Sequence, residues 1–315
     1  MTDKKPKFPP IFIIAFGIVA VSTSSIFIRF AQIEADSLVI AAFRLSIASL
    51  ILIPITIIKK RTEFKLLHRK DYILAGISGF FLSVHFAAWI TSLEYTSIAS
   101  SVVLVSTTPL WVALFSPITI KEKISKQVII GLIIALTGTV IIGFSDICKV
   151  NGSIVCPNIA EITTGKAFIG DFFALVGSWM GAGYVLIGRK LRAKTSTLSY
   201  ITLVYSIAAV FLLIFMILSG QKFTGFSSQT YLFFALLAII PQLLGHSSFN
   251  WALGYLSATF VSITLLGEPI GSTILGYLVF SETPSPINLF GAILILTGII
   301  VAFLTKNISI ESTGE

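Results

Sequence analysis

The chain has 315 residues, of which 55% are hydrophobic and 11% are charged, and it carries a net charge of +8. An average soluble domain has roughly 25% charged residues, so this chain has too few polar groups to cover a compact soluble surface. The composition therefore excludes a cytosolic globular enzyme, a nucleic-acid-binding module and a disordered scaffold. The positive charge needs no nucleic-acid partner, because the positions of the basic residues explain it.

Ten apolar stretches follow one another along the chain. A helix needs about 20 mostly apolar residues to cross the roughly 30 Å hydrocarbon core of a bilayer. The stretches that meet this requirement are 10–31, 37–58, 71–93, 97–119, 126–146, 166–188, 199–219, 229–253, 257–280 and 285–305. They are continuous rather than alternating, which excludes a β-barrel. The sequence therefore predicts an all-α membrane protein with ten transmembrane helices.

Lysine and arginine are divided unequally between the two sides of these spans. With the N-terminus placed in the cytoplasm, seventeen of the 22 fall in cytoplasmic segments, and Arg44 lies inside a span. The outer segments hold Arg29, Lys149, Lys166 and Lys222. Because short cytoplasmic loops carry an excess of positive charge, this pattern predicts a multi-pass protein with both termini in the cytoplasm.

The chain matches itself at a constant offset of 160 residues. The most informative identical pairs are Arg29/Arg189, Tyr95/Tyr255, Pro109/Pro269, Glu122/Glu282, Gly131/Gly291 and Gly138/Gly298. We therefore expect a first five-helix repeat at 1–145 and a second at 166–305. An extracytoplasmic linker at 146–165 joins them, and 306–315 form a cytoplasmic tail.

A five-helix unit crosses the membrane an odd number of times, so the second repeat starts from the opposite face. The halves are then inverted repeats, a construction typical of secondary transporters. Paired Gly or Pro interruptions in the two halves of such proteins indicate the binding site. Pro109 and Pro269 are such a pair near mid-span, where proline removes a helical hydrogen bond. A kink that only shapes helix packing is the alternative.

Each half carries a proline in its fourth helix, a glutamate thirteen residues later and a Gly-rich fifth helix. The segments concerned are Thr108-Pro109-Leu110-Trp111 with Glu122, Gly267-Glu268-Pro269-Ile270-Gly271 with Glu282, and the Thr-Gly pairs at 137–138 and 297–298. In these features nearly the whole chain resembles the EamA family of the drug/metabolite transporter superfamily. The resemblance implies an inner-membrane permease whose central cavity is lined by the first four helices of each half. The fifth helices would lie at the periphery, with a homodimer through them as an open alternative.

Two charged residues stand out inside the predicted spans. Glu268 lies about halfway along the ninth span, where a charge costs several kcal/mol, so it could bind a proton or an amine substrate. The alternative is a structural Glu268, hydrogen-bonded to a carbonyl freed by Pro269 or held in a salt bridge. Arg44 lies about two turns from the outer end of the second span. It could extend outward to the interface, pair with Glu268 or Asp171, or bind a substrate carboxylate.

Polar and aromatic residues share one face on two repeat-related helices. His85 and Trp89 are four residues apart on the third helix, and His246 and Asn250 are four apart on the eighth. A mostly apolar wall with a few orienting polar groups is typical of a ligand cavity. Hydrogen bonding between helices is the alternative for His and Asn, and packing or interfacial anchoring for the aromatic residues. Trp111, just after the proline break, is a further aromatic candidate.

The sequence has no G-x-x-x-x-G-K-[ST] phosphate loop and no histidine spacing typical of a metal site, so we expect no cofactor. The linker contains the two cysteines of the chain, Cys148 and Cys156. Outside the cytoplasm two thiols at this separation can close a disulfide, with free thiols as the alternative.

Together these features predict a secondary transporter rather than an enzyme. We expect export of a small amphipathic metabolite such as an amino acid by alternating access, with protons as a candidate coupling ion. One alternative is an exchanger of phosphorylated or nucleotide-linked sugars, which would need several cations facing the cavity, whereas only Arg44 is available. Another is a membrane-embedded enzyme, which would need an acid/base or metal cluster that the sequence lacks.

Overall fold

The computed structural model describes residues 6, 8–96, 98–147, 149–150, 154–155, 166–280 and 286–304. Their helices group into ten spans, and six of these spans are each formed by one helix. These helices are α3 (Ser37–Lys65), α4 (Arg69–Tyr95), α7 (Lys126–Ile147), α9 (Lys166–Arg192), α10 (Thr197–Leu218) and α15 (Pro286–Phe303). Of these, α3 has a kink at Lys60, near its end. A hairpin of two short antiparallel strands follows α7, formed by β1 (Lys149–Val150) and β2 (Ile154–Val155).

Four spans consist of shorter helices placed end to end. They are α1 (Pro10–Ser22) with α2 (Ser24–Ala31); α5 (Ile98–Val105) with α6 (Thr108–Thr119); α11 (Ser228–Leu237) with the π-helix η1 (Ala238–His246) and α12 (Ser247–Ala252); and α13 (Ala258–Thr264) with the 3₁₀ turn η2 (Leu265–Gly267) and α14 (Glu268–Phe280). Seven spans are long and apolar enough to cross a membrane, and three shorter apolar helices accompany them. The predicted all-α membrane fold is confirmed.

Repeat-related helices run in opposite directions. The fourth span ends with α6 at Thr119, and its repeat-related ninth span begins with α13 at Ala258. Both of these ends meet at Glu122, whose Oε2 accepts a hydrogen bond from the Ala258 backbone N–H at 3.0 Å. The end of one helix therefore lies beside the start of its repeat partner, as inverted repeats require.

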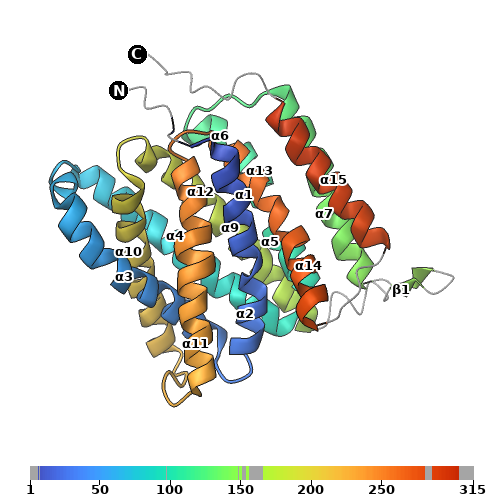
Figure 1. Cartoon of the computed structure of the whole chain (residues 1–315), viewed down its shortest axis with the longest axis horizontal. Helices are drawn as coiled ribbons and strands as arrows, with labels where there is room; N and C mark the ends of the chain where they lie inside the picture. Colours follow the sequence, from blue (N-terminus) through green and yellow to red (C-terminus); the bar gives the residue numbers. More distant parts are fainter. Residues whose placement is uncertain are drawn as a thin grey trace.

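The fifth helices of the two halves, α7 and α15, lie side by side at one edge of the molecule (Figure 1). Gly131 faces the Gly298 carbonyl and Gly138 faces the Gly291 carbonyl, and a Cβ added to Gly131 or to Gly138 would lie 2.5 Å from that oxygen. The two contacts exchange when each residue is shifted by 160, as a pseudo-two-fold axis dictates. Glycine is needed here because the backbones touch. The outward sides of these helices are apolar and exposed, and a homodimer through them stays a prediction.

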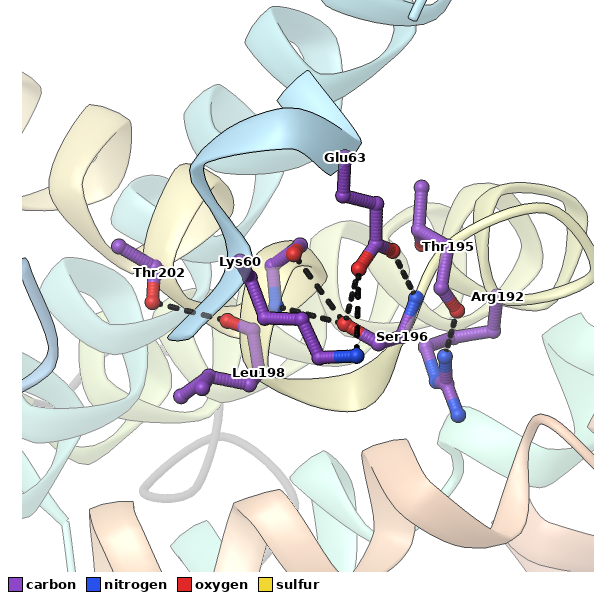
Figure 2. A network of polar contacts seen from close by, with 8 residues as sticks. Lys60, Glu63, Arg192, Thr195, Ser196, Leu198 and Thr202 are labelled. Carbon is purple, nitrogen blue, oxygen red and sulfur yellow. Dashed lines mark hydrogen bonds and ion pairs between the residues drawn. The ribbon is translucent and has the colours of Figure 1, made fainter. Parts of the chain in front are cut away.

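Capping contacts hold the loops at both ends of the bundle. At the end where α3 and α9 finish, which we call the basic end, the Glu63 carboxylate accepts hydrogen bonds from the Ser196 backbone N–H and hydroxyl (Figure 2). At the opposite end, Glu34 accepts hydrogen bonds from the Ser227 backbone N–H and the Thr230 hydroxyl. These carboxylates bind N–H groups that a helix start leaves without a partner, so they fix the spans that surround the cavity.

Candidate functional site

A cavity of about 70 Å³ lies between the two halves of the molecule. Most of its wall is apolar, and its polar lining includes His85, Ser106, Thr108, His246, Asn250 and Glu268. Ligand pockets usually measure roughly 300–1,000 Å³, whereas one water occupies about 30 Å³. At about 70 Å³ the cavity is smaller than a typical ligand pocket, so we expect it to widen when a metabolite binds.

The first half contributes a broken helix to this cavity. The fourth span stops at Val105 and restarts at Thr108, with Pro109 in the first turn of α6. Pro109 has no N–H to offer the Val105 carbonyl, and the Thr108 hydroxyl donates to that carbonyl at 2.7 Å. The Leu104 carbonyl accepts from both the backbone N–H and the hydroxyl of Thr107, at 3.1 and 2.7 Å. Pro109 is buried and lines the cavity.

The second half breaks at the repeat-related position. The 3₁₀ turn η2 interrupts the ninth span, and α14 restarts at Glu268 with the buried Pro269 next to it. The break lies against the discontinuity of the first span, where α1 ends at Ser22. There the Ser22 hydroxyl donates to the Glu268 carbonyl at 3.4 Å, and the Ser272 hydroxyl donates to the Ser22 carbonyl at 3.3 Å. Interrupted helices from both halves therefore meet beside the cavity.

Glu268 presents its side chain to the cavity. Within the described part of the chain, its carboxylate has no hydrogen bond and no ion pair within 4.0 Å. The structural alternatives for this residue, a bond to a freed carbonyl or a salt bridge, are therefore absent among the described residues. An acidic group without a protein partner is free to bind a proton or a cation.

Arg44 is fully buried, and its position differs from the expected one. Its Nε donates to Gln242 Oε1 at 2.8 Å, its Nη1 donates to Ser24 Oγ at 2.9 Å, and its guanidinium carbon lies 4.2 Å from the centre of the Phe86 ring. The possible extension to the interface is wrong, because residues of three other spans enclose the side chain. No carboxylate of the described residues lies within 4.0 Å, so the expected pair with Glu268 or Asp171 is not formed in this structure.

Two further candidates do not contribute to the cavity wall. Asp171 accepts a hydrogen bond from Thr96 Oγ1 at 2.8 Å near the start of α9. Trp111 donates from Nε1 to Thr107 Oγ1 at 3.3 Å, and its ring lies edge-on to Trp179 at 5.6 Å. Trp111 thus packs α6 against α9 outside the cavity, despite its position just after the break.

His85 lines the cavity from α4 and is anchored to α9. Its Nδ1 lies 2.7 Å from the Gly177 carbonyl oxygen. Because a carbonyl only accepts, Nδ1 carries a proton, and in a neutral ring Nε2 is then a hydrogen-bond acceptor. The His85 ring also stacks on Trp89, with the ring centres 6.3 Å apart. The indole N–H of Trp89 is buried and has no partner among the described residues.

In two repeat-related contacts the small and the large residue have exchanged places, and this exchange makes room for the His85 ring. Its repeat partner is Gly245, which packs against Val21, and a Cβ on Gly245 would lie 2.6 Å from the Val21 side chain. In the other half Gly181 occupies the position of Val21, and its Cβ would lie 2.9 Å from His85 Nδ1. Both large residues therefore come from the first half, from α4 in one contact and from α1 in the other, which places an imidazole on only one side of the cavity.

The eighth span carries His246 and Asn250 in different settings. His246 closes the π-helix η1, which contains Pro241, and its ring lies edge-on to Phe86 at 5.3 Å. Asn250 accepts from the Tyr184 hydroxyl at 2.8 Å and donates to the Tyr205 hydroxyl at 3.0 Å. Asn250 thus joins α9, α10 and α12, so the structure favours the interhelical alternative for this residue.

Sequence reasoning missed several polar residues around the cavity. The missed residues are Ser24, Thr108, Tyr184, Tyr205 and Gln242. Each is a polar side chain inside an apolar span, which is the signal that could have indicated it. Pro241 gave a similar signal for the π-helix, because prolines and π-helical turns both interrupt the regular hydrogen bonding of a span.

Ionic contacts close the basic end below the cavity. Arg189 Nε lies 2.5 Å from Glu122 Oε1, and Arg189 Nη1 donates to the Leu253 carbonyl at 3.0 Å. Glu122 in turn accepts from the Ala258 N–H. This cluster connects the end of α6 in the first half to the ends of α9 and of the eighth span and to the start of α13 in the second half, so these segments cannot separate without breaking it.

A second contact at the basic end, made by Arg192, has a weaker counterpart at the opposite end. Arg192 Nε donates to the Asn250 carbonyl at 2.8 Å, and Arg192 also donates to the Thr195 carbonyl (Figure 2). Shifted by 160 residues, the first contact becomes the bond from Gln32 Nε2 to the Ile90 carbonyl, at 3.2 Å. A guanidinium suits the negative end of a helix better than a neutral amide does. Among the described residues, this contact is therefore stronger at the basic end than at the opposite end.

The two cysteines of the linker, Cys148 and Cys156, lie outside the described residues. The disulfide between them stays a prediction.

Comparison with known proteins gives consistent matches. The family model described as EamA-like transporter family matches residues 8–144 and 168–304. An uncharacterized transporter of Archaeoglobus fulgidus is 22% identical over 88% of this chain and 91% of its own. A WAT1-related protein of Arabidopsis thaliana is 24% identical over 97% and 96%. A solved crystal structure with 16% identity superposes with a TM-score of 0.73 over 94% of this chain and 96% of the other, which supports the fold.

Proposed function

The chain belongs to the EamA-like transporter family, and from that premise we propose that it exports small amphipathic metabolites, amino acids among them, by alternating access. It is a multi-pass membrane transporter and not an enzyme. The observation that carries the proposal is Glu268, a carboxylate that has no hydrogen bond or ion pair with any described residue and lies at a cavity between two inverted repeats. Such a group can bind a proton and a substrate in turn, which is what coupling to a proton gradient requires.

Alternating access is supported by the contrast between the two ends of the bundle. The Arg189–Glu122 cluster holds the basic end closed. Arg29, the repeat partner of Arg189, is exposed at the opposite end. Because the halves are inverted repeats, exchanging their conformations would open one end and close the other. We propose that the structure corresponds to a state whose basic end is shut.

We further propose that the basic end faces the cytoplasm of a cell with an inner membrane. The segments that gather there carry most of the lysine and arginine residues, as short cytoplasmic loops do. Both chain termini would then be cytoplasmic. Export would carry the substrate from the basic end to the opposite end.

An exchanger of phosphorylated or nucleotide-linked sugars fits the cavity less well. Of the described residues that line it, none is lysine or arginine. Arg44, the candidate from the sequence, is enclosed behind Phe86. A phosphate dianion would have no cation to bind in this cavity.

A flux screen in proteoliposomes tests the proposal. Purified protein is reconstituted, and the efflux of radiolabelled amino acids and amines is followed with and without a pH gradient. We expect at least one compound to leave protein-containing vesicles faster than protein-free vesicles. We expect still faster efflux when the solution outside the vesicles is more acidic than the solution inside. Equal efflux from both kinds of vesicle for every compound would contradict the proposal.

A further inference from the structure

The hydrogen-bonding groups of the cavity indicate which end of the substrate is recognised. We propose that the site binds a protonated primary amine between Glu268 and His85 Nε2, and that it does not require a carboxylate on the substrate. The inference rests on the transport function proposed above. It narrows the substrate class from amphipathic metabolites in general to compounds with an ammonium group and an apolar body.

The first step is the orientation of the His85 ring. Its Nδ1 edge lies against α9, where the Gly177 carbonyl accepts at 2.7 Å and Gly181 leaves room for the ring. The nitrogen left for the cavity is Nε2, an acceptor in the neutral ring. An ammonium group is donor-only, so it fits this nitrogen, whereas a carboxylate is acceptor-only and does not.

The second step is the charge of the cavity. Glu268 adds a second acceptor with a negative charge, and the described lining residues include no lysine or arginine to balance it. The nearby cation, Arg44, lies behind Phe86, donates from Nε to Gln242 and from Nη1 to Ser24, and keeps Nη2 without a partner among the described residues. Because Arg44 is not part of the cavity wall, a substrate ammonium finds an acidic group there, whereas a substrate carboxylate finds no cation among the described lining residues.

The third step is the neutral donor of the cavity. Trp89 lines the cavity and is 4% exposed. Its indole N–H has no hydrogen-bond partner among the described residues. A buried donor without a partner costs roughly 1–3 kcal/mol, so a ligand acceptor there would be favourable. A carbonyl, a hydroxyl or an aromatic face can serve, and none of them needs a charge.

The apolar part of the substrate follows from the remaining wall. Leu82, Phe249, Val261 and Leu266 surround the polar groups. An aliphatic or aromatic body of moderate size suits these side chains once the cavity has opened. The inferred class is therefore an amphipathic amine, which includes amino-acid amides and esters and the amines left by decarboxylation.

The experiment compares amines with matched acids on the purified protein. The probes are 3-methylbutylamine and 2-phenylethylamine, their acid counterparts 4-methylpentanoate and 3-phenylpropanoate, and leucinamide as an amine with a neutral acceptor. Thermal stability and competition for flux are measured with each probe. We expect the amines and leucinamide to stabilise the protein and to compete, and the acids to do neither.

Two variants of His85 separate the roles of its two ring nitrogens. His85→Asn keeps a donor for the Gly177 carbonyl but loses the Nε2 acceptor, and His85→Gln keeps an acceptor near Nε2. We expect amine affinity to fall about tenfold in His85→Asn and to stay near wild type in His85→Gln, since one hydrogen bond to a charged group has about that worth. Glu268→Gln should lower amine affinity more than tenfold.

Three outcomes would overturn the inference. The acids compete while the amines do not, or His85→Gln loses as much affinity as His85→Asn, or no amine binds although the flux screen finds another substrate. In the third case the transport function would stand and only the ammonium site would fall. Absence of flux for every compound would instead contradict the transport function itself.

Discussion

Arg189 and Glu122 form an ion pair, 2.5 Å between Nε and Oε1, that joins the two halves at the basic end. Both side chains are largely buried, with 14% and 18% of their surfaces exposed. The pair also positions the Leu253 carbonyl and the Ala258 N–H. It is therefore the contact that must break first if the basic end is to open.

Removing the charge of Glu122 should open the basic end. Glu122→Gln leaves Arg189 buried without a counter-charge, and breaking one partner of a buried pair costs roughly 3–5 kcal/mol, less here because the pair is partly exposed. We expect the variant to favour the state with the basic end open. The readout is labelling of Ser106→Cys, a cavity position, by a thiol reagent added to the basic side.

The labelling experiment requires a background without the native cysteines, Cys148→Ser with Cys156→Ser. Glu34→Gln, at the opposite end, serves as the matched control and should label like the parent protein. Equal labelling of Glu122→Gln and the parent would show that the ion pair does not control access.

A methyl group at Gly131 should separate the fifth helices. In Gly131→Ala the new Cβ would lie 2.5 Å from the Gly298 carbonyl, so α7 and α15 must move apart. We expect a loss of about 1–3 kcal/mol, as for other overpacked sites, visible as a lower Tm in detergent. Gly76→Ala is the control, because nothing lies within 4 Å of its added Cβ and helix propensity improves. A Tm for Gly131→Ala at or above that of Gly76→Ala would exclude the close contact.

Arg44 and Gln242 should be energetically coupled. Gln242→Leu removes the acceptor from a fully buried guanidinium, which should cost about 1–3 kcal/mol. Arg44→Met in the same chain removes the charge that needed the acceptor, so the double variant should be more stable than the sum of the two single effects predicts. Thermal unfolding of the four proteins measures the coupling, and strict additivity would argue against the bond.

Acidification should loosen the start of α11 at the opposite end. The Ser227 backbone amide and the Thr230 hydroxyl lower the pKa of Glu34 below its ordinary value of 4.5. Because the folded-state pKa is the lower one, the stabilisation is present above the ordinary value and is lost as the pH falls through the folded-state value. The protection factor of the Ser227 amide against hydrogen exchange, which is the intrinsic rate divided by the observed rate, should therefore fall on acidification in the wild type but not in Glu34→Gln. The same pH profile for both proteins would contradict this role of the carboxylate.

The sequence predicted the ten spans, the inverted repeat and both proline breaks, because these depend on length, hydropathy and a constant offset. The surroundings of single side chains were harder to predict. For Arg44 the sequence left extension to the interface, a carboxylate pair and substrate binding open, and in the structure contacts from Ser24, Phe86 and Gln242 enclose it. Those partners lie up to 198 residues away along the chain, and hydropathy carries no information about such pairs.

The polar candidates show the same limit, because their partners lie on helices far away in the sequence. His85 and His246, which helical spacing places on the same faces as Trp89 and Asn250, are among the residues that line the cavity. The spacing did not show that the Asn250 side chain would form hydrogen bonds with the hydroxyls of Tyr184 and Tyr205, because these tyrosines lie on other helices. Trp111 follows a helix break, yet the rotation of α6 turns it toward Trp179.

The measurement that tests the central claim most directly is the pH dependence of transport in Glu268→Gln proteoliposomes. The account predicts that wild-type efflux responds to a pH gradient and that the variant, folded with an unchanged Tm, loses this response. An amide at this position can neither release a proton nor bind an ammonium group by charge. A variant with the same efflux and the same pH profile as the wild type would contradict the account.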